Sequence, residues 1–563
     1  MTLEKLRSQI ASVVRQELGD DLDLGKIVLS YVPESMAGDF ATNAAMVYSK
    51  DLHRPAAELA KELAAAIEKG VEGVAHAEVA GPGFVNLTLR NELVAEMAMS
   101  APHTKPTSLA NKDIVAEYSD PNPFKVLHVG HLYTSVVGDA IGNLMSLAGG
   151  NVHRVNFGGD VGRHVAITMW AIIRELGGQH PEKLSEIPES ARSKWMAARY
   201  VSGTKAFEED DAAKAQIIEL NKMIYDIHSK NDHESSLAQI YWTCRTWSYE
   251  YFEQFYDRIG SHFEKYYPES ETASLGTKTV LEQLDKGVYK KSDGAVVFEG
   301  EPYGLHTRVF ITSQGLPTYE AKDVGLIMTK WQDYHFDLSV VITGSDITDY
   351  MKVVLQSLKQ FAPELADRTR HITHGNVKLA GGVKMASRKG NFLAAVDVLD
   401  LAAEASERAN GTKDPRVVLG AVKYAFLKSR IGADLVFIPE ESVSLDGNSG
   451  PYLQYAYARA RTLLSKAGAK PADQLDDLTD PERILALKVS QYPDVLERSV
   501  ADLLPHYIAT YLYELAQTFN RFYEGNRVIG DPRERTRLRL VELYSEVLRE
   551  SLRLLGIDAP DHL

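Results

Sequence analysis

Two short stretches of the chain carry residue types suited to chemistry on a triphosphate. The first is His128-Val129-Gly130-His131, in which two imidazoles lie three positions apart. Such positions are neighbours on one helical turn, so both rings could donate hydrogen bonds to phosphate oxygens as charge develops in a transition state. Gly130 lacks a side chain and would let a flat base approach the backbone, where a helix N-terminus offers free N–H groups.

The second stretch is the basic loop Lys384-Met385-Ala386-Ser387-Arg388-Lys389-Gly390, within the acid-free run 376–390. A loop of this kind can close on a triphosphate and stabilise departing pyrophosphate. Taken alone, each motif is weak: the first is more often two unrelated surface histidines, and the second a solvated basic loop. Their order along the chain decides between these interpretations.

Apolar runs and periodicities indicate which elements position the two motifs. Residues 114–118 form an apolar strand, a polar turn follows, and apolar residues recur at helical spacing from 129 to 144. Further strand segments are expected at 152–157, 336–344 and 371–379. This alternation predicts an α/β, Rossmann-type parallel sheet with helices on both faces. One motif follows the first strand and the other the last, with a charged, largely helical insertion at about 178–300 between them.

The rest of the chain divides around this sheet. Residues 1–104 mix helical and strand patterns, as in an α+β domain, and a polar linker precedes the sheet domain at 105–404. Residues 405–446 and 447–563 are almost wholly helical in pattern, which predicts an all-α bundle.

Composition sets broad limits. The 563 residues are 44% hydrophobic and 25% charged, and no stretch approaches the roughly 20 apolar residues of a membrane span. The N-terminus has the pattern of an amphipathic helix and no targeting signal, so we expect a cytoplasmic protein. The single cysteine, Cys244, excludes internal disulfides and a Cys-rich zinc site, and its apolar surroundings indicate buried packing. The net charge of −15 weighs little against nucleic-acid binding, because that needs only a local basic surface.

In their order, the two motifs look like the HIGH and KMSKS signatures of class I aminoacyl-tRNA synthetases, with related nucleotidyltransferases as competitors. The longer context resembles arginyl-tRNA synthetases over nearly the whole chain. The runs that carry this resemblance are GDFATNAAM (38–46), GPGFVNLTL (81–89), EYSDPNPFKVLHVGH (117–131), NFGGDVG (156–162), PTYEAKD (317–323), KMASRKGN (384–391), GNSGPYLQYAYARAR (447–461) and YLYELAQTFNRFYEGNRV (511–528).

The resemblance implies that the chain joins L-arginine to the terminal adenosine of tRNA(Arg) in two steps, through arginyl-adenylate, with release of AMP and pyrophosphate. It implies ATP with Mg²⁺ as a substrate, no tightly bound metal or organic cofactor, no membrane partner and a monomeric enzyme. The four regions become an additional tRNA-binding domain (1–104), the catalytic domain (105–404), a stem-contact connecting region (405–446) and an anticodon-binding domain (447–563). Relatives commonly need bound tRNA before the first step, and we expect the same here.

The resemblance also assigns roles to residues. The catalytic set is Lys125, His128, His131, Lys384 and Lys389. The ATP-binding set is His128, Gly130, His131, Gly375, Val377, Lys384, Met385 and Ser387. The arginine-binding set is Glu117, Ser119, Asn122, His128, Tyr319, Asp323 and Asp346. The tRNA-binding set is Tyr452, Tyr455, Arg459, Asn520, Arg521 and Arg527.

Several positions depart from the general pattern. Ser387 replaces the second lysine of the KMSKS signature, as is typical of arginyl enzymes, and Lys125 would supply the missing charge. Asp120 stands where many relatives have Ser, and Asp346 where many have Gln. The chain ends in His562-Leu563 where many relatives end in Arg-Met.

Two other readings remain at this point. One is a class I synthetase for another amino acid, such as cysteine or methionine, although those tend to keep the second lysine and many hold zinc through cysteines. The other is a non-catalytic tRNA-binding paralogue, which the intact histidines and basic loop argue against.

Overall fold

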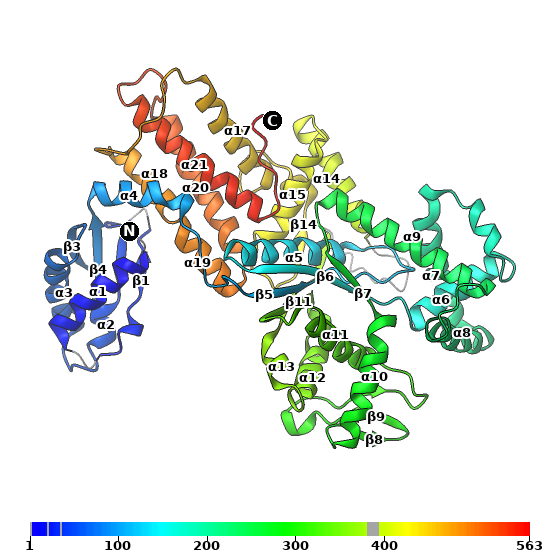
Figure 1. Ribbon diagram of the computed structural model, residues 1–563. Helices are drawn as coiled ribbons and strands as arrows, with labels where there is room; N and C mark the ends of the chain where they lie inside the picture. The colour runs from blue at the N-terminus through cyan, green and yellow to red at the C-terminus, as the bar shows by residue number, and fades with distance from the viewer. Residues whose placement is uncertain (1–2, 20–21, 34–35, 380–392) are drawn as a thin grey trace.

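The chain folds around a parallel sheet that crosses the middle of the molecule (Figure 1). The computed structural model describes residues 3–19, 22–33, 36–379 and 393–563. In sheet order the strands are β12 (Thr369–His374), β11 (Leu338–Gly344), β5 (Asp113–Glu117), β6 (Asn151–Gly158) and β7 (Lys265–Pro268). Every neighbouring pair is parallel. The predicted parallel sheet is therefore confirmed, with β5 at its centre.

Helices cover both faces of this sheet. α5 (Val129–Leu147) lies on one face, and α11 (Tyr319–Tyr334) and α12 (Thr348–Lys359) lie on the other (Figure 1). A strand covered on both sides needs apolar side chains in both directions, and Ile114, Val115 and Ala116 of β5 are all fully buried. This double cover leaves the carboxyl ends of the strands as the open edge where a ligand can bind.

A helical unit projects from the sheet after β6 and has its own apolar core (Figure 1). It comprises α6 (Arg163–Glu175), α7 (Arg192–Glu209), α8 (Asp211–Ser229) and α9 (Ser236–Ile259). Cys244 lies in this core, so the expectation of a buried, packed cysteine is confirmed, and burial raises the pKa of its thiol.

The insertion expected at about 178–300 differs in one respect. Its residues Lys265–Pro268 form β7, which pairs with β6 as an edge strand of the central sheet, so this stretch is not only an addition between two halves. The following α10 (Glu269–Asp285) packs on α11, and an antiparallel sheet has the order β10-β9-β8. Its strands are β8 (Lys290–Ser292), β9 (Ala295–Phe298) and β10 (Arg308–Ile311).

The N-terminal region is an antiparallel sheet with the order β1-β2-β4-β3 and helices packed on it. Its elements are α1 (Leu3–Leu18), β1 (Leu29–Tyr31), β2 (Phe40–Thr42), α2 (Ala44–Tyr48), α3 (Ala56–Gly70), β3 (Val74–Ala80), β4 (Phe84–Leu89) and α4 (Asn91–Ser100). Val85, Leu87 and Leu89 of β4 are buried, as the alternating pattern predicts.

The C-terminal region is mostly helical and packs above the central sheet (Figure 1). It comprises α14 (Ala395–Asn410), α15 (Pro415–Leu427), β14 (Leu435–Phe437), α16 (Pro439–Ser442), α17 (Gly450–Lys466), α18 (Asp480–Ser490), α19 (Tyr492–Asp502), α20 (His506–Gly525) and α21 (Glu534–Leu554). In α20, Ile508, Leu512 and Phe519 are fully buried, which confirms the predicted apolar face, but Tyr523 is 37% exposed. Among the described helices, none is long and apolar enough to cross a membrane.

Hydrogen bonds join the N-terminal region to two of these helices, α18 and α19. Arg483 of α18 donates two hydrogen bonds to the Asp39 carboxylate, at 2.9 and 2.6 Å, and a third to Asn91. The Tyr31 hydroxyl donates to Asp494 of α19, where burial raises the pKa of the Asp494 carboxyl to about 6. These bonds join residues between 392 and 463 positions apart in sequence, so they connect the N-terminal region to the C-terminal helices.

Candidate active site

A cavity of about 790 Å³ opens at the carboxyl ends of β5, β11 and β12. It lies between the first turn of α5 and the loops that follow these strands. Predicted site residues around it are Glu117, Ser119, Asn122, His128, Gly130, His131, Tyr319, Asp323, Asp346, Gly375 and Val377. The expected arginine- and ATP-binding residues of the described chain therefore share one cavity. Lys384, Met385, Ser387 and Lys389 lie outside the described residues.

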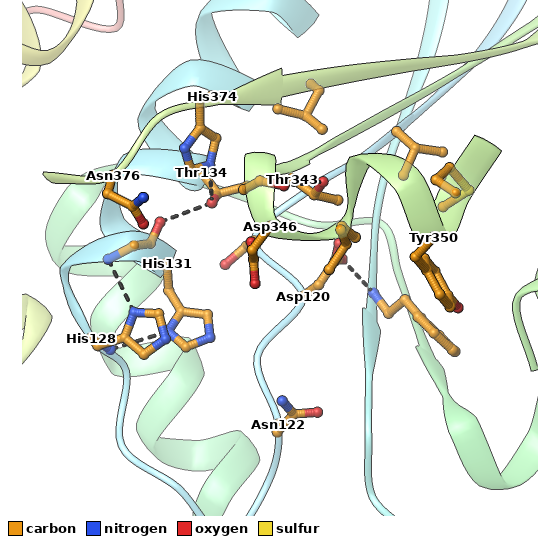
Figure 2. Close-up of a pocket in the computed structure, with 18 of the residues that line it drawn as sticks. Asp120, Asn122, His128, His131, Thr134, Thr343, Asp346, Tyr350, His374 and Asn376 are labelled. Atoms are coloured by element: carbon orange, nitrogen blue, oxygen red, sulfur yellow. Dashed lines mark hydrogen bonds between the residues drawn. The ribbon is translucent and has the colours of Figure 1, made fainter. Parts of the chain in front are cut away.

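The two histidines form the start of α5 (Figure 2). His128 is the N-cap residue, and its Nδ1 accepts a hydrogen bond from the Gly130 N–H at 3.0 Å. The His131 Nδ1 in turn accepts from the His128 N–H at 3.1 Å, and the two ring centroids lie 3.9 Å apart. Because both Nδ1 atoms act as acceptors, each neutral ring carries its proton on Nε2 and can donate from that atom.

Electrostatics keep both rings neutral. Burial, assisted by the nearby Lys125 charge, lowers the pKa of His128 to about 4. Burial, His128 and Lys125 lower the pKa of His131 well below its ordinary value. Such rings offer fixed N–H donors toward phosphate without bringing positive charge of their own.

Lys125 lies close to this pair but outside the cavity lining. Its ammonium sits 4.7 Å from the centre of the Tyr200 ring, a cation–π contact with α7 of the helical unit. Its charge nevertheless depresses the pKa of both His128 and His131, which places it within electrostatic reach of the same site.

Carboxylates gather at the other end of the cavity. Glu117 ends β5, Asp120 follows it, and Asp323 lies on the first turns of α11 beside Tyr319. Burial and the Glu117 charge raise the pKa of both Asp120 and Asp323, an effect opposed by Lys330. Lys330 faces these three acids, and Lys322 pairs with a fourth cavity acid, Glu269. Because the buried acids outnumber the buried lysines, this end of the cavity favours a cationic ligand.

Glu117 and Asp323 each have a protein partner. Lys330, fully buried in α11, donates to Glu117 Oε2 and, at 3.1 Å, to Ser339 Oγ. The Tyr350 hydroxyl of α12 donates to Asp323 Oδ2. Glu117 is therefore both a salt-bridged acid and a cavity residue.

The turn after β5 is held in an unusual backbone conformation. Ser119, Asp120 and Phe124 have φ values of 75°, 48° and 67°, in the left-handed region that non-glycine residues seldom adopt. Tertiary bonds hold it there: Ser119 Oγ lies 2.7 Å from the Tyr256 hydroxyl, and Asp120 Oδ1 accepts from the Phe157 N–H at 2.9 Å. Asn122 Oδ1 accepts from the Gly159 N–H at 2.9 Å, so its NH₂ group is left as the donor.

Across the cavity, Asp346 and the residues after β12 face the histidines (Figure 2). Gly375 packs against the backbone of Ala433, where a Cβ would lie only 2.2 Å from the carbonyl oxygen. His374, just before it, bonds Thr134 of α5 at 2.7 Å and so ties the two walls together. Tyr319 is 57% exposed at the cavity mouth.

The predicted tRNA-binding residues do not line this cavity: they lie on α17, on α20 and, for Arg527, just after α20. Asn520 donates to the Tyr452 hydroxyl at 2.8 Å and accepts from Arg459 at 3.3 Å. The Arg459 guanidinium lies 4.9 Å from the ring centre of Tyr455, whose side chain is exposed. Arg521 bonds within its own helix to Thr518, and Arg527 bonds the backbone of Ile529. On the same two helices, Tyr457 and Phe519 are buried and pack the bundle.

Sequence patterns did not indicate Thr134, Arg308, Lys330, Tyr350 or His374, which line or support the cavity. Of these five, only Tyr350 could have been suspected from the sequence, because it follows the predicted site residue Asp346 at the helical spacing of four positions. Among the described residues, no group of three or more His, Cys, Asp or Glu side chains is placed to hold a metal ion.

Family models match most of the chain. The model described as "tRNA synthetases class I (R), catalytic domain" matches residues 93–439. The "Arginyl tRNA synthetase N terminal domain" matches residues 4–89, and the "DALR anticodon binding domain" matches residues 453–563. The three matches follow the order of the N-terminal region, the central sheet and the C-terminal helices.

Individual proteins agree with these matches. The arginine–tRNA ligase of Treponema denticola is 32% identical over 478 residues, which cover 80% of each chain. That of Porphyromonas gingivalis is 28% identical over the whole of both chains. Among solved structures, the arginyl-tRNA synthetase of Thermus thermophilus matches the fold with a TM-score of 0.80 at 23% identity, covering all of each chain.

Proposed function

The chain belongs to the arginyl-tRNA synthetase family and charges tRNA with arginine at the expense of ATP, and on this premise we propose how the residues around the cavity share the reaction. Membership of this family excludes both alternatives that the sequence left open, a synthetase for another amino acid and a non-catalytic paralogue. The observation that carries the residue assignment is the cavity itself, with neutral imidazoles at one end and excess carboxylates at the other.

The acid end holds the arginine side chain. Glu117 and Asp323 face the guanidinium, with Tyr319 at the mouth of the cavity, because buried acids in excess of their cations need a positive ligand. Asn122, Ser119, His128 and Asp346 surround the α-amino and carboxylate end. A ligand without the guanidinium would leave carboxylate oxygens unpaired, and this gives strong discrimination without a separate editing step.

The imidazole end holds ATP as its Mg²⁺ complex. The adenine lies near Gly130 and the segment of Gly375 and Val377, and the phosphates lie near the Nε2 donors of His128 and His131. Lys125 and the loop residues Lys384, Met385, Ser387 and Lys389 add contacts to the triphosphate, the loop residues lying outside the described part of the chain.

The reaction then needs alignment and charge stabilisation rather than a protein nucleophile. A carboxylate oxygen of arginine attacks the α-phosphorus of ATP, the bond to the β-phosphate oxygen breaks, and pyrophosphate leaves. A hydroxyl of the terminal tRNA adenosine then attacks the arginyl carbonyl, and AMP leaves. Donated hydrogen bonds from His128 and His131 stabilise the charge that builds on the phosphate oxygens.

The remaining parts of the molecule serve tRNA. The helices that match the anticodon-binding family read unpaired bases by stacking and edge hydrogen bonds through Tyr452, Tyr455, Arg459, Asn520, Arg521 and Arg527. The N-terminal domain contacts another part of the tRNA. We place the enzyme in the cytoplasm as a monomer of 62.4 kDa, a mass that light scattering at assay concentrations can check.

Two measurements test the assignment of the acid end. Aminoacylation of total tRNA with each amino acid in turn should give product with arginine. Asp323→Asn should raise the KM for arginine about 100-fold or more, because the guanidinium loses a charged partner. The surface variant Asp349→Asn, on the neighbouring α12, is the matched control. An unchanged KM in Asp323→Asn would remove this residue from the arginine site.

The order of events has its own test. Exchange of pyrophosphate into ATP is measured with arginine, in the presence and absence of tRNA. We expect exchange only when tRNA is present, and equal rates in the two conditions would refute that requirement.

A further inference from the structure

Two side chains, Lys330 and Tyr350, donate hydrogen bonds to the acids of the cavity. Lys330 is completely buried, and its ammonium contacts Glu117 Oε2 and Ser339 Oγ. Tyr350 is only partly buried, and its hydroxyl contacts Asp323 Oδ2. Each donor therefore engages one oxygen of one acid.

The second carboxylate oxygen of each acid remains available to a ligand. Within the described residues, neither Glu117 Oε1 nor Asp323 Oδ1 has a hydrogen-bond partner, and both side chains line the cavity. The acids themselves come from different elements, β5 and α11, so the two remaining oxygens belong to separate walls.

Both donors are themselves held in place. Lys330 follows Asp323 by seven positions, so one face of α11 presents an acid to the cavity and a cation behind it. The Tyr350 ring lies under the Arg308 guanidinium at 5.6 Å, and Arg308 also pairs with Glu320 of α11 at 3.2 Å. Neither donor can turn away without breaking a second contact.

We propose that Lys330 and Tyr350 are positioning residues for arginine specificity: each holds one oxygen of Glu117 or Asp323, so that one oxygen from each acid is presented to the guanidinium. This inference rests on the proposed role of the two acids in binding arginine. The guanidinium is then bridged between two carboxylates, rather than gripped by both oxygens of one. A planar group with N–H donors on several sides fits this arrangement, whereas a compact ammonium cannot span the two walls.

Tyr350→Phe gives the sharpest test, because it removes one hydroxyl and keeps the ring against Arg308. We expect the KM for arginine in aminoacylation to rise about tenfold to 100-fold, the usual effect of losing a hydrogen bond to a charged group. The kcat and the KM for ATP should stay unchanged. Tyr303→Phe, which removes a surface hydrogen bond to Gln360, is the matched control.

Lys330→Met tests the second donor, with Lys359→Met as a surface control. It should raise the KM for arginine by a similar factor. Since it leaves a buried acid unpaired, this variant could fail to fold, so Lys330→Met is also made in a Glu117→Gln background. If Lys330 acts through Glu117, it adds nothing to the KM of Glu117→Gln alone.

The outcomes separate this inference from the proposed function. If Asp323→Asn raises the KM for arginine but Tyr350→Phe does not, the acids bind arginine and the positioning role of Tyr350 is refuted. If Lys330→Met raises that KM equally with and without the Glu117 carboxylate, its positioning role is refuted. If Asp323→Asn has no effect, the acid site and the inference built on it both fail.

Discussion

At the scale of single residues, the histidines of α5 work as neutral donors. Their Nδ1 atoms are occupied by backbone N–H groups, and burial next to Lys125 holds the pKa of His128 at about 4. Their contribution is therefore a pair of oriented Nε2–H groups, which matter only when charge develops on the phosphate.

His131→Ala should lower the kcat of arginine-dependent pyrophosphate exchange about 100- to 1,000-fold, as for loss of one oriented donor to a transition state. The KM for ATP should change little, because the bond strengthens mainly in the transition state. The exposed His180→Ala is the control. A variant that raised the KM for ATP and kept kcat would show ground-state binding instead.

The pH dependence of the exchange activity follows from the lowered pKa of His128. A histidine with its pKa lowered to about 4 stays neutral as the pH falls from 8 to 6, so His128 causes no loss of exchange activity in that window. A fall in kcat with a midpoint near 6.5, absent in His128→Asn, would contradict this assignment.

The residues differ in how far the sequence alone could predict them. Tyr319 and Asp323 share a helix and lie four apart, so helical periodicity placed them on one side. Lys330 carries no local signal, because its partner comes from a distant part of the chain: Glu117 is 213 positions from Lys330. A lysine in a helix is read as a surface residue, and only the folded sheet shows that this one is buried.

At the scale of elements, the first turn of α5 belongs to the site, whereas the rest of the helix packs on the sheet. Two glycines of this helix face different neighbours. A Cβ on Gly130 would lie 2.7 Å from His128 Cε1, whereas a Cβ on Gly138 would lie 2.2 Å from Cγ of the buried Tyr118. One substitution therefore disturbs the site, and the other disturbs the packing of α5 on the sheet.

Gly130→Ala should keep the melting temperature, because alanine favours a helix by about 1 kcal/mol, but should lower kcat at least about tenfold through displacement of the His128 ring. Gly138→Ala should lower the melting temperature, since overpacking typically costs about 1–3 kcal/mol. Thermal unfolding and exchange assays on both variants check the contrast. Equal stability losses in the two variants would contradict it.

The strands differ in how well the sequence pattern predicts them. The strands β5 and β11 were predictable because each is a largely buried apolar run. β7 was not, since Lys265–Pro268 is only four residues long and has no clear alternation, and only its pairing with β6 in the folded sheet identifies it as a strand. The segment expected at 371–379 divides into β12, which joins the central sheet, and the short β13 (Val377–Leu379), which pairs with β14 instead.

At the scale of the whole molecule, Arg483 links the N-terminal domain to the helical region. Its guanidinium binds the buried Asp39 carboxylate with two hydrogen bonds, and it also contacts Asn91 and the Leu89 carbonyl. This contact holds the N-terminal domain against α18.

Arg483→Ala should release the N-terminal domain, because it leaves the Asp39 charge buried without a cation, at a cost on the order of 3–5 kcal/mol. We expect faster proteolysis near residues 101–112 and a higher KM for tRNA, with the KM for arginine and ATP unchanged. Arg498→Ala, a nearby arginine that lies over the Tyr507 ring, is the control. If Arg483→Ala kept the wild-type rate of proteolysis and the wild-type KM for tRNA, this contact would not set the position of the N-terminal domain.

The order of the central sheet has a consequence for how the protein is made. Glu117 ends the middle strand, but the lysine that neutralises it lies 213 residues further along the chain. At roughly 5–20 residues per second, a ribosome needs about 10–40 s to reach that lysine. Throughout this interval the nascent chain holds an acid destined for its interior, so the sheet cannot close around β5 until translation has passed α11.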